Sequence, residues 1–160
     1  MNNRIHSDDF YMLIADKYSE FFSGCQKVKV GCCIVKNNRI IGLGANRSVP
    51  DLCGKAGCLR VALYGNDDKT HREPGDCRAL HSEIDAISSC AASNESTEGA
   101  TVYVTRYPCE ACARALVAAK VSRVVYGRQQ EISLETQNIF SSAGCSVYHA
   151  KTWDMPDKTN

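Results

Sequence analysis

Apolar side chains recur at helical spacing near the start of the chain. From Asp8 to Phe22 the apolar positions lie three and four residues apart, and Ser7 is a suitable N-cap for a helix over this range. The apolar face predicted for this helix consists of Phe10, Leu13, Ile14, Tyr18 and Phe21. An apolar run over 28–35, the pair Asn37-Asn38 and a second run over 40–45 then predict a β-hairpin.

The second half of the chain alternates between helical and strand patterns. The pattern predicts helices over 81–92, 108–120 and 134–143, and strands over 101–105, 121–126 and 146–149. Because these strands follow one another through helices, we expect parallel pairing, right-handed crossovers and helices on both faces of the sheet. Residues 47–78 show no period, and the chain is polar from about 151 onward. We therefore expect a single domain over 1–160, with an insertion at 47–78 and a loose C-terminal tail.

Composition narrows the class of protein further. Hydrophobic residues make up 44% and charged residues 23% of the chain, as in ordinary globular domains. No apolar stretch reaches the roughly 18–20 residues of a membrane span, and the N-terminus lacks the apolar segment of a secretory signal, so a cytoplasmic protein is expected. Nineteen basic and eighteen acidic residues nearly cancel, which disfavours a nucleic-acid partner.

Two short motifs place metal-binding residues at the starts of two predicted helices. They are His81-Ser82-Glu83 and Pro108-Cys109-Glu110-Ala111-Cys112. Both helices follow strands of one sheet, so their N-termini can meet at one edge, where the helix dipoles favour thiolates. Ten cysteines in a chain without an export signal also favour metal ligation over disulfides.

The residue types in these motifs indicate a catalytic zinc site. His81, Cys109 and Cys112 supply three ligands and leave the fourth position of a tetrahedral zinc open, as catalytic sites do. Glu83 is not needed as a ligand and is free to transfer protons beside the metal. The alternative interpretation makes Cys109 and Cys112 small core residues and His81 a helix-capping side chain.

The two motifs together match H-x-E…P-C-x-x-C, the signature of zinc nucleobase deaminases. Within that superfamily the chain resembles the deoxycytidylate (dCMP) deaminases from about Tyr11 to Val147. Further landmarks of the resemblance are Val30-Gly31 and the segments 41–46, 81–87, 99–105 and 124–126. It implies a cytidine-deaminase-like three-layer α/β/α sandwich with a five-stranded mixed sheet. It also implies zinc-dependent deamination of dCMP to dUMP and ammonia, Glu83 as the catalytic acid and base, a small-molecule nucleotide as partner, and a homo-oligomer.

The resemblance further implies a second, structural zinc in the cysteine-rich insertion. The ligands it indicates are Cys25, Cys53, His71 and Cys77, with Cys58 as the substitute. A closed site of this kind would keep a long irregular segment ordered. In the alternative interpretation these residues are free thiols and a surface histidine. Cys32, Cys33, Cys90 and Cys145 lie in apolar contexts and are expected in the core.

Substrate contacts follow from the resemblance position by position. The matching residues are Asn46, Asp85, Tyr126, Arg47 and Arg106. Asn46 matches a sugar contact and Tyr126 a pocket tyrosine, whereas Arg47 and Arg106 flank the pocket and are able to hold a phosphate. Each residue also has an ordinary structural interpretation: a turn asparagine, a buried tyrosine, a solvated arginine, and for Asp85 a place on the helix surface.

The chain departs from the family pattern H-A-E-x-N-A at two positions, where it has Ser82 and Asp85. An ionised Asp85 near the nucleotide would disfavour a 5′-phosphate, which leaves a nucleoside, another base or an RNA-borne base as alternative substrates. A catalytically inactive zinc-stabilised binding module is a further alternative, against which the intact Glu83 argues. The segment 47–52 replaces the glycine-rich stretch of regulated members, so regulation by dCTP and dTTP is not assumed.

Overall fold

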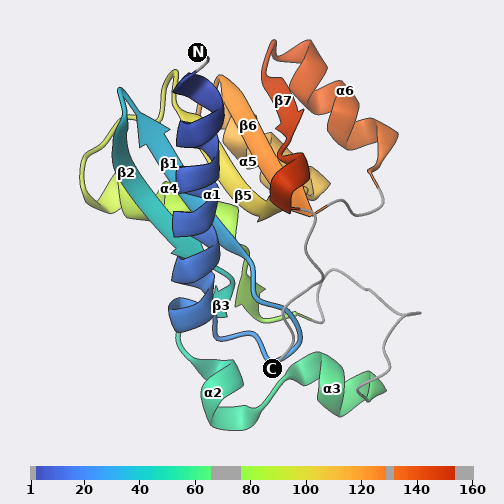
Figure 1. The fold of residues 1–160 in the computed structure, drawn as a ribbon. Helices are drawn as coiled ribbons and strands as arrows, with labels where there is room; N and C mark the ends of the chain where they lie inside the picture. Colours follow the sequence, from blue (N-terminus) through green and yellow to red (C-terminus); the bar gives the residue numbers. More distant parts are fainter. Residues whose placement is uncertain (1–2, 66–76, 129–131, 154–160) are drawn as a thin grey trace.

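The computed structural model describes residues 3–65, 77–128 and 132–153, which are arranged around a five-stranded mixed sheet (Figure 1). The strand order is β2-β1-β5-β6-β7, and the strands are β1 (Gly31–Lys36), β2 (Arg39–Ala45), β5 (Thr101–Arg106), β6 (Arg123–Arg128) and β7 (Ser146–His149). β1 pairs antiparallel with both β2 and β5, whereas β5, β6 and β7 run parallel. The predicted hairpin and the predicted parallel strands are therefore confirmed. Asn37 and Asn38 both adopt positive φ in the hairpin turn, a conformation asparagine tolerates.

Helices cover both faces of the sheet (Figure 1). They are α1 (Asn3–Phe22), α4 (Ser82–Ala92), α5 (Glu110–Ala118) and α6 (Leu134–Ser142). Alternate residues of β1 face opposite layers: Cys32 and Ile34 belong to the cluster with α4, α5 and α6, whereas Cys33 and Val35 pack with α1. This confirms the three-layer α/β/α sandwich. The four cysteines expected in the core are indeed buried there.

The first helix presents a different face to the sheet from the one predicted. The buried side chains of α1 include Tyr11, Met12, Ala15 and Ser19. Phe10, Leu13 and Phe21 of the predicted apolar face are instead 53%, 42% and 81% exposed, whereas Ile14 of that face is partly buried and packs against the core cluster. The reason is close packing at Gly31, where an added Cβ would overlap the carbonyl of Ala15. At this closest approach the residues of α1 that face Gly31 are Ala15 and Ser19, while Tyr11 and Met12 are buried nearer the start of the helix.

The insertion contains short elements that the sequence pattern did not reveal. They are β3 (Arg47–Ser48), α2 (Leu52–Ala56), α3 (Leu59–Tyr64) and β4 (Ala79–Leu80). Elements of two to six residues are too short to show a hydrophobic period. β3 pairs antiparallel with β4, and Arg47 lies opposite Leu80. The start of the insertion is therefore held next to β4, the strand that follows the insertion and leads directly into His81.

The C-terminal segment is ordered further than expected. Lys151–Trp153 form a 3₁₀ turn, and Trp153 packs against the cluster under α1. The rest of the predicted tail lies outside the described residues. None of the helices in the described part of the chain is both long and apolar enough to cross a membrane.

Gly42 and Gly44 of β2 allow α4 to lie directly on the sheet, because an added Cβ at either position would overlap atoms of α4. A Cβ at Gly44 would overlap the carbonyl of Ser82 and the backbone of Ala86. We therefore expect Gly44→Ala to destabilise the protein by about 2–3 kcal/mol in urea unfolding, since overpacking displaces the helix. Gly144→Ala is the matched control: no atom lies within 4 Å of its added Cβ, and its positive φ alone should cost about 1 kcal/mol. Equal costs for both substitutions would contradict the packing explanation.

Candidate active site

Two helix starts bring the predicted metal ligands together. His81 follows β4 and is the N-cap residue of α4, and Cys109 is the N-cap residue of α5. Neither side chain caps its own helix, so the imidazole and the thiol are available to each other. The alternative interpretation of His81 as a capping side chain is therefore wrong. Cys112 lies in the first turn of α5 and is buried.

The three ligand atoms form a cluster with the dimensions of a zinc site. His81 Nδ1 lies 3.5 Å from Cys109 Sγ and 3.4 Å from Cys112 Sγ. Tetrahedral zinc with ordinary Zn–N and Zn–S bond lengths requires a nitrogen–sulfur edge of roughly 3.6 Å. Within the described ranges, this is the only group of three His, Cys, Asp or Glu residues whose ligand atoms all lie within 4.8 Å of one another. The residues therefore fit a zinc ion that retains one open position.

The electrostatics of the cluster favour a thiolate. A hydrogen bond with Cys112, together with one from His81, lowers the pKa of Cys109 to about 4 despite partial burial. The same contact with Cys109 raises the pKa of His81. Cys109 is thus ionised at neutral pH, which is the form in which cysteine ligates a metal.

Glu83 lies beside the cluster without belonging to it. The side chain is buried, with the residue 4% exposed, and burial raises the pKa of its carboxyl. The Ser82 hydroxyl donates a hydrogen bond to Glu83 Oε2 at 3.1 Å. Glu83 also contributes to raising the pKa of Cys112, which places its carboxylate against that ligand. A shielded carboxyl with a raised pKa, next to a metal site, is suited to accept and return a proton.

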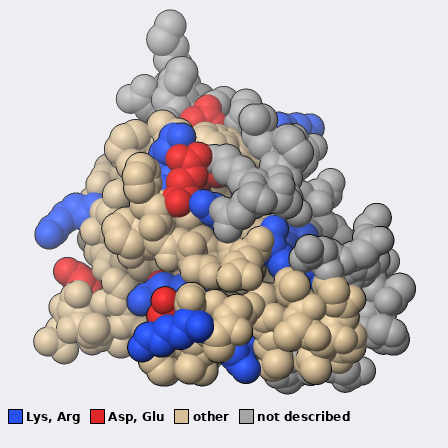
Figure 2. All heavy atoms as spheres, turned by 90° about the horizontal axis from the view of Figure 1, so that it is seen from below, with Lys and Arg blue, Asp and Glu red and all other residues tan. Residues whose placement is uncertain are grey.

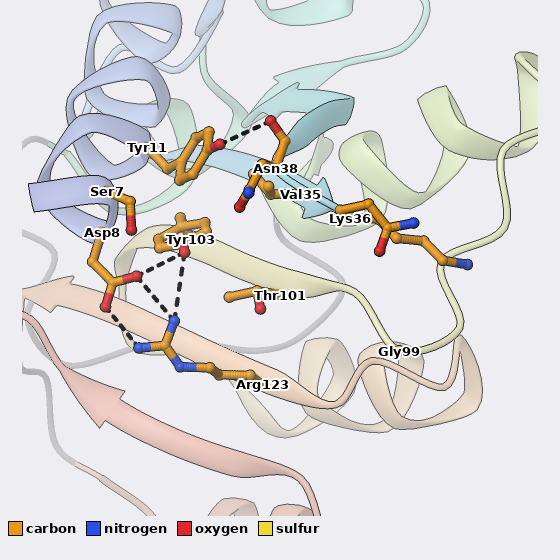
Figure 3. A pocket seen from close by; sticks show the side chains of 11 residues that line it. Ser7, Asp8, Tyr11, Val35, Lys36, Asn38, Gly99, Thr101, Tyr103 and Arg123 are labelled. Carbon is orange, nitrogen blue, oxygen red and sulfur yellow. Dashed lines mark hydrogen bonds and ion pairs between the residues drawn. The ribbon is translucent and has the colours of Figure 1, made fainter. Parts of the chain in front are cut away.

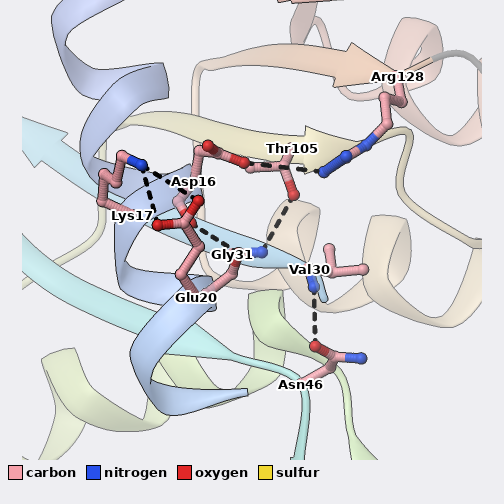
Figure 4. Close-up of polar contacts among 9 residues, drawn as sticks. Asp16, Lys17, Glu20, Val30, Gly31, Asn46, Thr105 and Arg128 are labelled. Atoms are coloured by element: carbon pink, nitrogen blue, oxygen red, sulfur yellow. Dashed lines mark hydrogen bonds and ion pairs between the residues drawn. The ribbon is translucent and has the colours of Figure 1, made fainter. Parts of the chain in front are cut away.

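Asn46 holds the segment before β1 in place. Its Oδ1 accepts hydrogen bonds from the Val30 amide at 2.8 Å and the Ser23 hydroxyl at 2.7 Å, and its Nδ2 donates to the Val28 carbonyl at 2.8 Å (Figure 4 shows the Val30 contact). Three of the four hydrogen-bonding positions of the amide are therefore used within the protein. The predicted sugar contact, which remains a prediction, would depend on the remaining N–H.

Asp85 and Arg47 form an ion pair that the sequence did not predict. Arg47 donates to Asp85 through Nε at 3.0 Å and Nη2 at 2.8 Å, and the Ala45 amide donates to Asp85 Oδ2 at 3.1 Å. Asp85 is 5% exposed, so its alternative place on the helix surface is wrong. The negative charge that distinguishes this chain from the family pattern is balanced by an arginine 38 residues away.

The other two predicted substrate residues lie on neighbouring strands, Tyr126 within β6 and Arg106 at the end of β5. Tyr126 is buried in β6, packs edge-on against Tyr107 at 4.7 Å between ring centroids, and stacks on His149 at 5.0 Å. Arg106 ends β5, is half-buried, and lies three residues before Cys109. The predicted roles of Tyr126 in the pocket and of Arg106 beside it agree with these positions and remain predictions.

The second zinc site remains a prediction. His71 lies outside the described residues. Cys53 is buried, and Cys25, Cys58 and Cys77 are half-buried; none of the four forms a disulfide in the part of the chain that the structure describes. Among the residues that the structure describes, these cysteines do not form a three-ligand group of the kind seen at His81.

One cation near the site was missed in the sequence. Arg60 lies in the first turn of α3. Its positive charge lowers the pKa of His81, but the hydrogen bond with Cys109 raises that pKa by more. The side-chain Nε of Arg60 is shielded from solvent. No sequence signal marks this residue, because the insertion around it has no period.

A hollow of about 190 Å³ lies at the opposite end of the sheet (Figure 3). Three of its polar side chains bind one another. Arg123 donates hydrogen bonds to both carboxylate oxygens of Asp8, at 2.9 and 2.7 Å. The Tyr103 hydroxyl donates a hydrogen bond to Asp8 at 2.7 Å. This network ties the start of α1 to β5 and β6. None of the predicted site residues lines it.

The fold and the zinc-type cluster identify the family. The family model for the "Cytidine and deoxycytidylate deaminase zinc-binding region" matches residues 5–128 of this chain. The chain belongs to this family of zinc-binding cytidine and deoxycytidylate deaminases, as the resemblance in the sequence implied.

Individual relatives agree with this assignment. The chain is 34% identical over 125 residues to the deoxycytidylate deaminase of Mycobacterium phage D29, covering 76% of this chain and 94% of the relative. It is 31% identical over 135 residues to ComE operon protein 2 of Bacillus subtilis, covering 83% of this chain but only 66% of that relative. It also superposes with a TM-score of 0.67 on the dCMP deaminase of cyanophage S-TIM5 solved with dCMP and dUMP, at 26% identity, covering 93% and 98% of the two chains.

Proposed function

We propose that this protein catalyses the hydrolytic deamination of dCMP to dUMP and ammonia. The observation that carries the proposal is the His81, Cys109 and Cys112 cluster with Glu83 buried beside it. Support for the substrate comes from the deoxycytidylate deaminase of phage D29 and the cyanophage enzyme solved with dCMP and dUMP.

The reaction requires a metal ion and one carboxylate. Zinc held by His81, Cys109 and Cys112 would act as a Lewis acid that lowers the pKa of water. Glu83 takes a proton from the water that attacks C4 and passes it to N3 of the ring. Glu83 then takes the remaining proton from the new C4 hydroxyl and delivers it to the exocyclic amine, so that the C4–N bond breaks and ammonia leaves as the C4 carbonyl forms.

The surroundings of Asp85 remove an objection to a phosphorylated substrate. On its own, an ionised Asp85 would repel a 5′-phosphate, but Arg47 binds both of its oxygens. The pair is neutral overall, so the departure from the family pattern does not argue against dCMP. We assign Asn46 to the sugar, Tyr126 to the pocket wall, and Arg47 and Arg106 to its rim.

The surface at this end of the molecule does not favour RNA. Figure 2 views the molecule from the end where α2 and α3 lie, and its described part shows basic side chains in separate groups between uncharged ones. A continuous basic surface is the usual mark of phosphate-backbone binding. A small nucleotide therefore fits better than a base within RNA.

A turnover panel tests the proposal directly. Metal-analysed protein is incubated with dCMP, dCTP, cytidine, deoxycytidine and guanine, and deamination is followed by the loss of ultraviolet absorbance. We expect dCMP to be the preferred substrate. Preference for an unphosphorylated nucleoside or for guanine would replace the substrate but keep the reaction, and no turnover in zinc-loaded protein would favour the inactive binding module.

The proposal includes a second, structural zinc in the insertion. We assign its ligands to Cys25, Cys53, His71 and Cys77, with Cys58 as the substitute. Support comes from the burial of Cys53 and from the absence of a disulfide at Cys25, Cys53, Cys58 and Cys77, all four of which the structure describes. A zinc content of two ions per chain would agree with this assignment, and one ion per chain would contradict it.

We also propose a cytoplasmic homo-oligomer. The support is the outward face of α1, where Phe21 and Phe22 are 81% and 56% exposed. Large exposed aromatic side chains on one helix are more typical of an interface than of a free surface. Light scattering of the purified protein measures the number of chains, and a monomer at micromolar concentration would contradict the proposal.

A further inference from the structure

Arg47 contacts the chain on both sides of His81. In β3 it pairs with Leu80 of β4, the residue directly before His81. Its side chain binds Asp85, which lies one helical turn after His81, since the Asp85 amide donates to the His81 carbonyl at 3.0 Å. One arginine therefore holds both the strand that leads into His81 and the first turn of the helix that follows it.

The carboxylate of Asp85 is the buried half of this contact. Its Oδ2 accepts hydrogen bonds from the Ala45 amide at 3.1 Å and from Arg47 Nε at 3.0 Å, and its Oδ1 accepts Arg47 Nη2 at 2.8 Å. The close packing at Gly44 sets the distance between α4 and β2. The two parallel bonds from the guanidinium add a direction, because they fix the orientation of both groups.

His81 stands where the backbone changes from strand to helix. It is extended, with φ −72° and ψ 152°, and Ser82 begins α4. Its imidazole does not cap the helix and instead contacts the Cys109 and Cys112 thiols of α5. The position of the imidazole therefore depends on how β4 and the first turn of α4 are held together. A metal site needs its ligand distances correct to about 0.2 Å, so small shifts of this turn affect binding.

We propose that Arg47 and Asp85 are positioning residues that hold His81 in place for zinc. The inference rests on the proposed function, because it concerns the zinc site which that function requires. Neither residue touches the metal in this assignment: Arg47 acts on the backbone before and after His81, and Asp85 anchors it. Groups that orient a metal ligand in this way change metal affinity by about 10- to 100-fold when they are replaced.

The test measures zinc affinity, which needs no substrate. Full-length wild type, Arg47→Met and the double variant Arg47→Met/Asp85→Asn compete with a chelator for zinc, and Cys112→Ser identifies the zinc that belongs to this site. We expect Arg47→Met to weaken zinc binding about 10- to 100-fold, because it leaves a buried carboxylate without its counter-charge. The double variant should recover part of the loss, since asparagine still accepts the Ala45 amide and carries no charge to balance.

Arg123→Met is the matched control. Arg123 donates to both oxygens of Asp8, at 2.9 and 2.7 Å, at the other end of the sheet (Figure 3). Its replacement should lower the free energy of unfolding in urea and leave the zinc affinity unchanged. Arg47→Lys keeps the charge without the fork, should lose less affinity than Arg47→Met, and serves the same test if Arg47→Met does not fold.

Three results would overturn the inference and leave the proposed function intact. They are an unchanged zinc affinity in the Arg47 variants, an equal loss of affinity in Arg123→Met, and no recovery in the double variant. A wild type that binds no zinc would overturn the proposed function as well, so the two failures are distinguishable.

Discussion

Replacing Glu83 by glutamine is expected to lower kcat for deamination by about 10³- to 10⁴-fold while the zinc content stays the same. The amide keeps the size and shape of the carboxylate but neither accepts nor returns a proton at neutral pH. Zinc should be retained because Glu83 is not among the three residues whose ligand atoms cluster. Steady-state turnover of dCMP and elemental analysis of the same preparation measure both quantities.

The neighbouring serine provides the control for this substitution. Ser82→Ala removes the 3.1 Å hydrogen bond to Glu83 Oε2 but leaves the carboxylate in place. We expect a change in kcat of no more than about tenfold, in line with the loss of one hydrogen bond. A Glu83→Gln variant as active as Ser82→Ala would refute the acid–base role of Glu83.

Replacing Cys112 by serine is expected to remove one zinc ion per chain and to abolish turnover. Cys112 is one of the three ligands, and its sulfur lies 3.4 Å from His81 Nδ1. A serine hydroxyl stays protonated at neutral pH and binds zinc poorly compared with a thiolate. Elemental analysis of freshly purified, reduced protein gives the zinc count, and the dCMP assay gives the activity.

Cys145 offers a matched cysteine that does not take part in the site. It is buried in the core cluster beneath α6, with 6% of the residue exposed. Cys145→Ala should keep both the zinc count and the turnover, although it will lower the stability somewhat. If Cys112→Ser retains the full zinc content of Cys145→Ala, the assignment of the metal site is wrong.

The site could be predicted largely because its residues act through local geometry. His81 and Glu83 are two residues apart, and Cys109 and Cys112 share a face in the first turn of one helix. The expectation that both helices follow strands of one sheet was wrong for α4: it follows β4 of the separate two-stranded sheet, whereas α5 follows β5 of the main sheet. The start of α4 is held at the main sheet by its close packing on β2. The burial that raises the pKa of Glu83 was not visible in the sequence, since it depends on what packs over α4.

Contacts between distant segments account for what was missed. The orientation of α1 depends on the fit between Ala15 and Gly31. The apolar face predicted from the sequence shares Ile14 with the observed face but includes Phe10, Leu13 and Phe21, which are exposed. Asp85 and Arg47 looked like two independent substrate residues, yet they bind each other across 38 residues. The sequence pattern did not mark Arg60 as a residue near the site, because the short helices of the insertion show no hydrophobic period.

The sequence by itself determined the order of the main helices and strands and singled out the three residues whose ligand atoms cluster, with a buried glutamate beside them, because spacing within a helix and the rules of strand connection are properties of the local chain. Only the tertiary structure decided which side of α1 meets the sheet and that Asp85 pairs with Arg47. These depend on how closely segments approach in space, and packing and electrostatic pairing are selected by distances that no local pattern encodes.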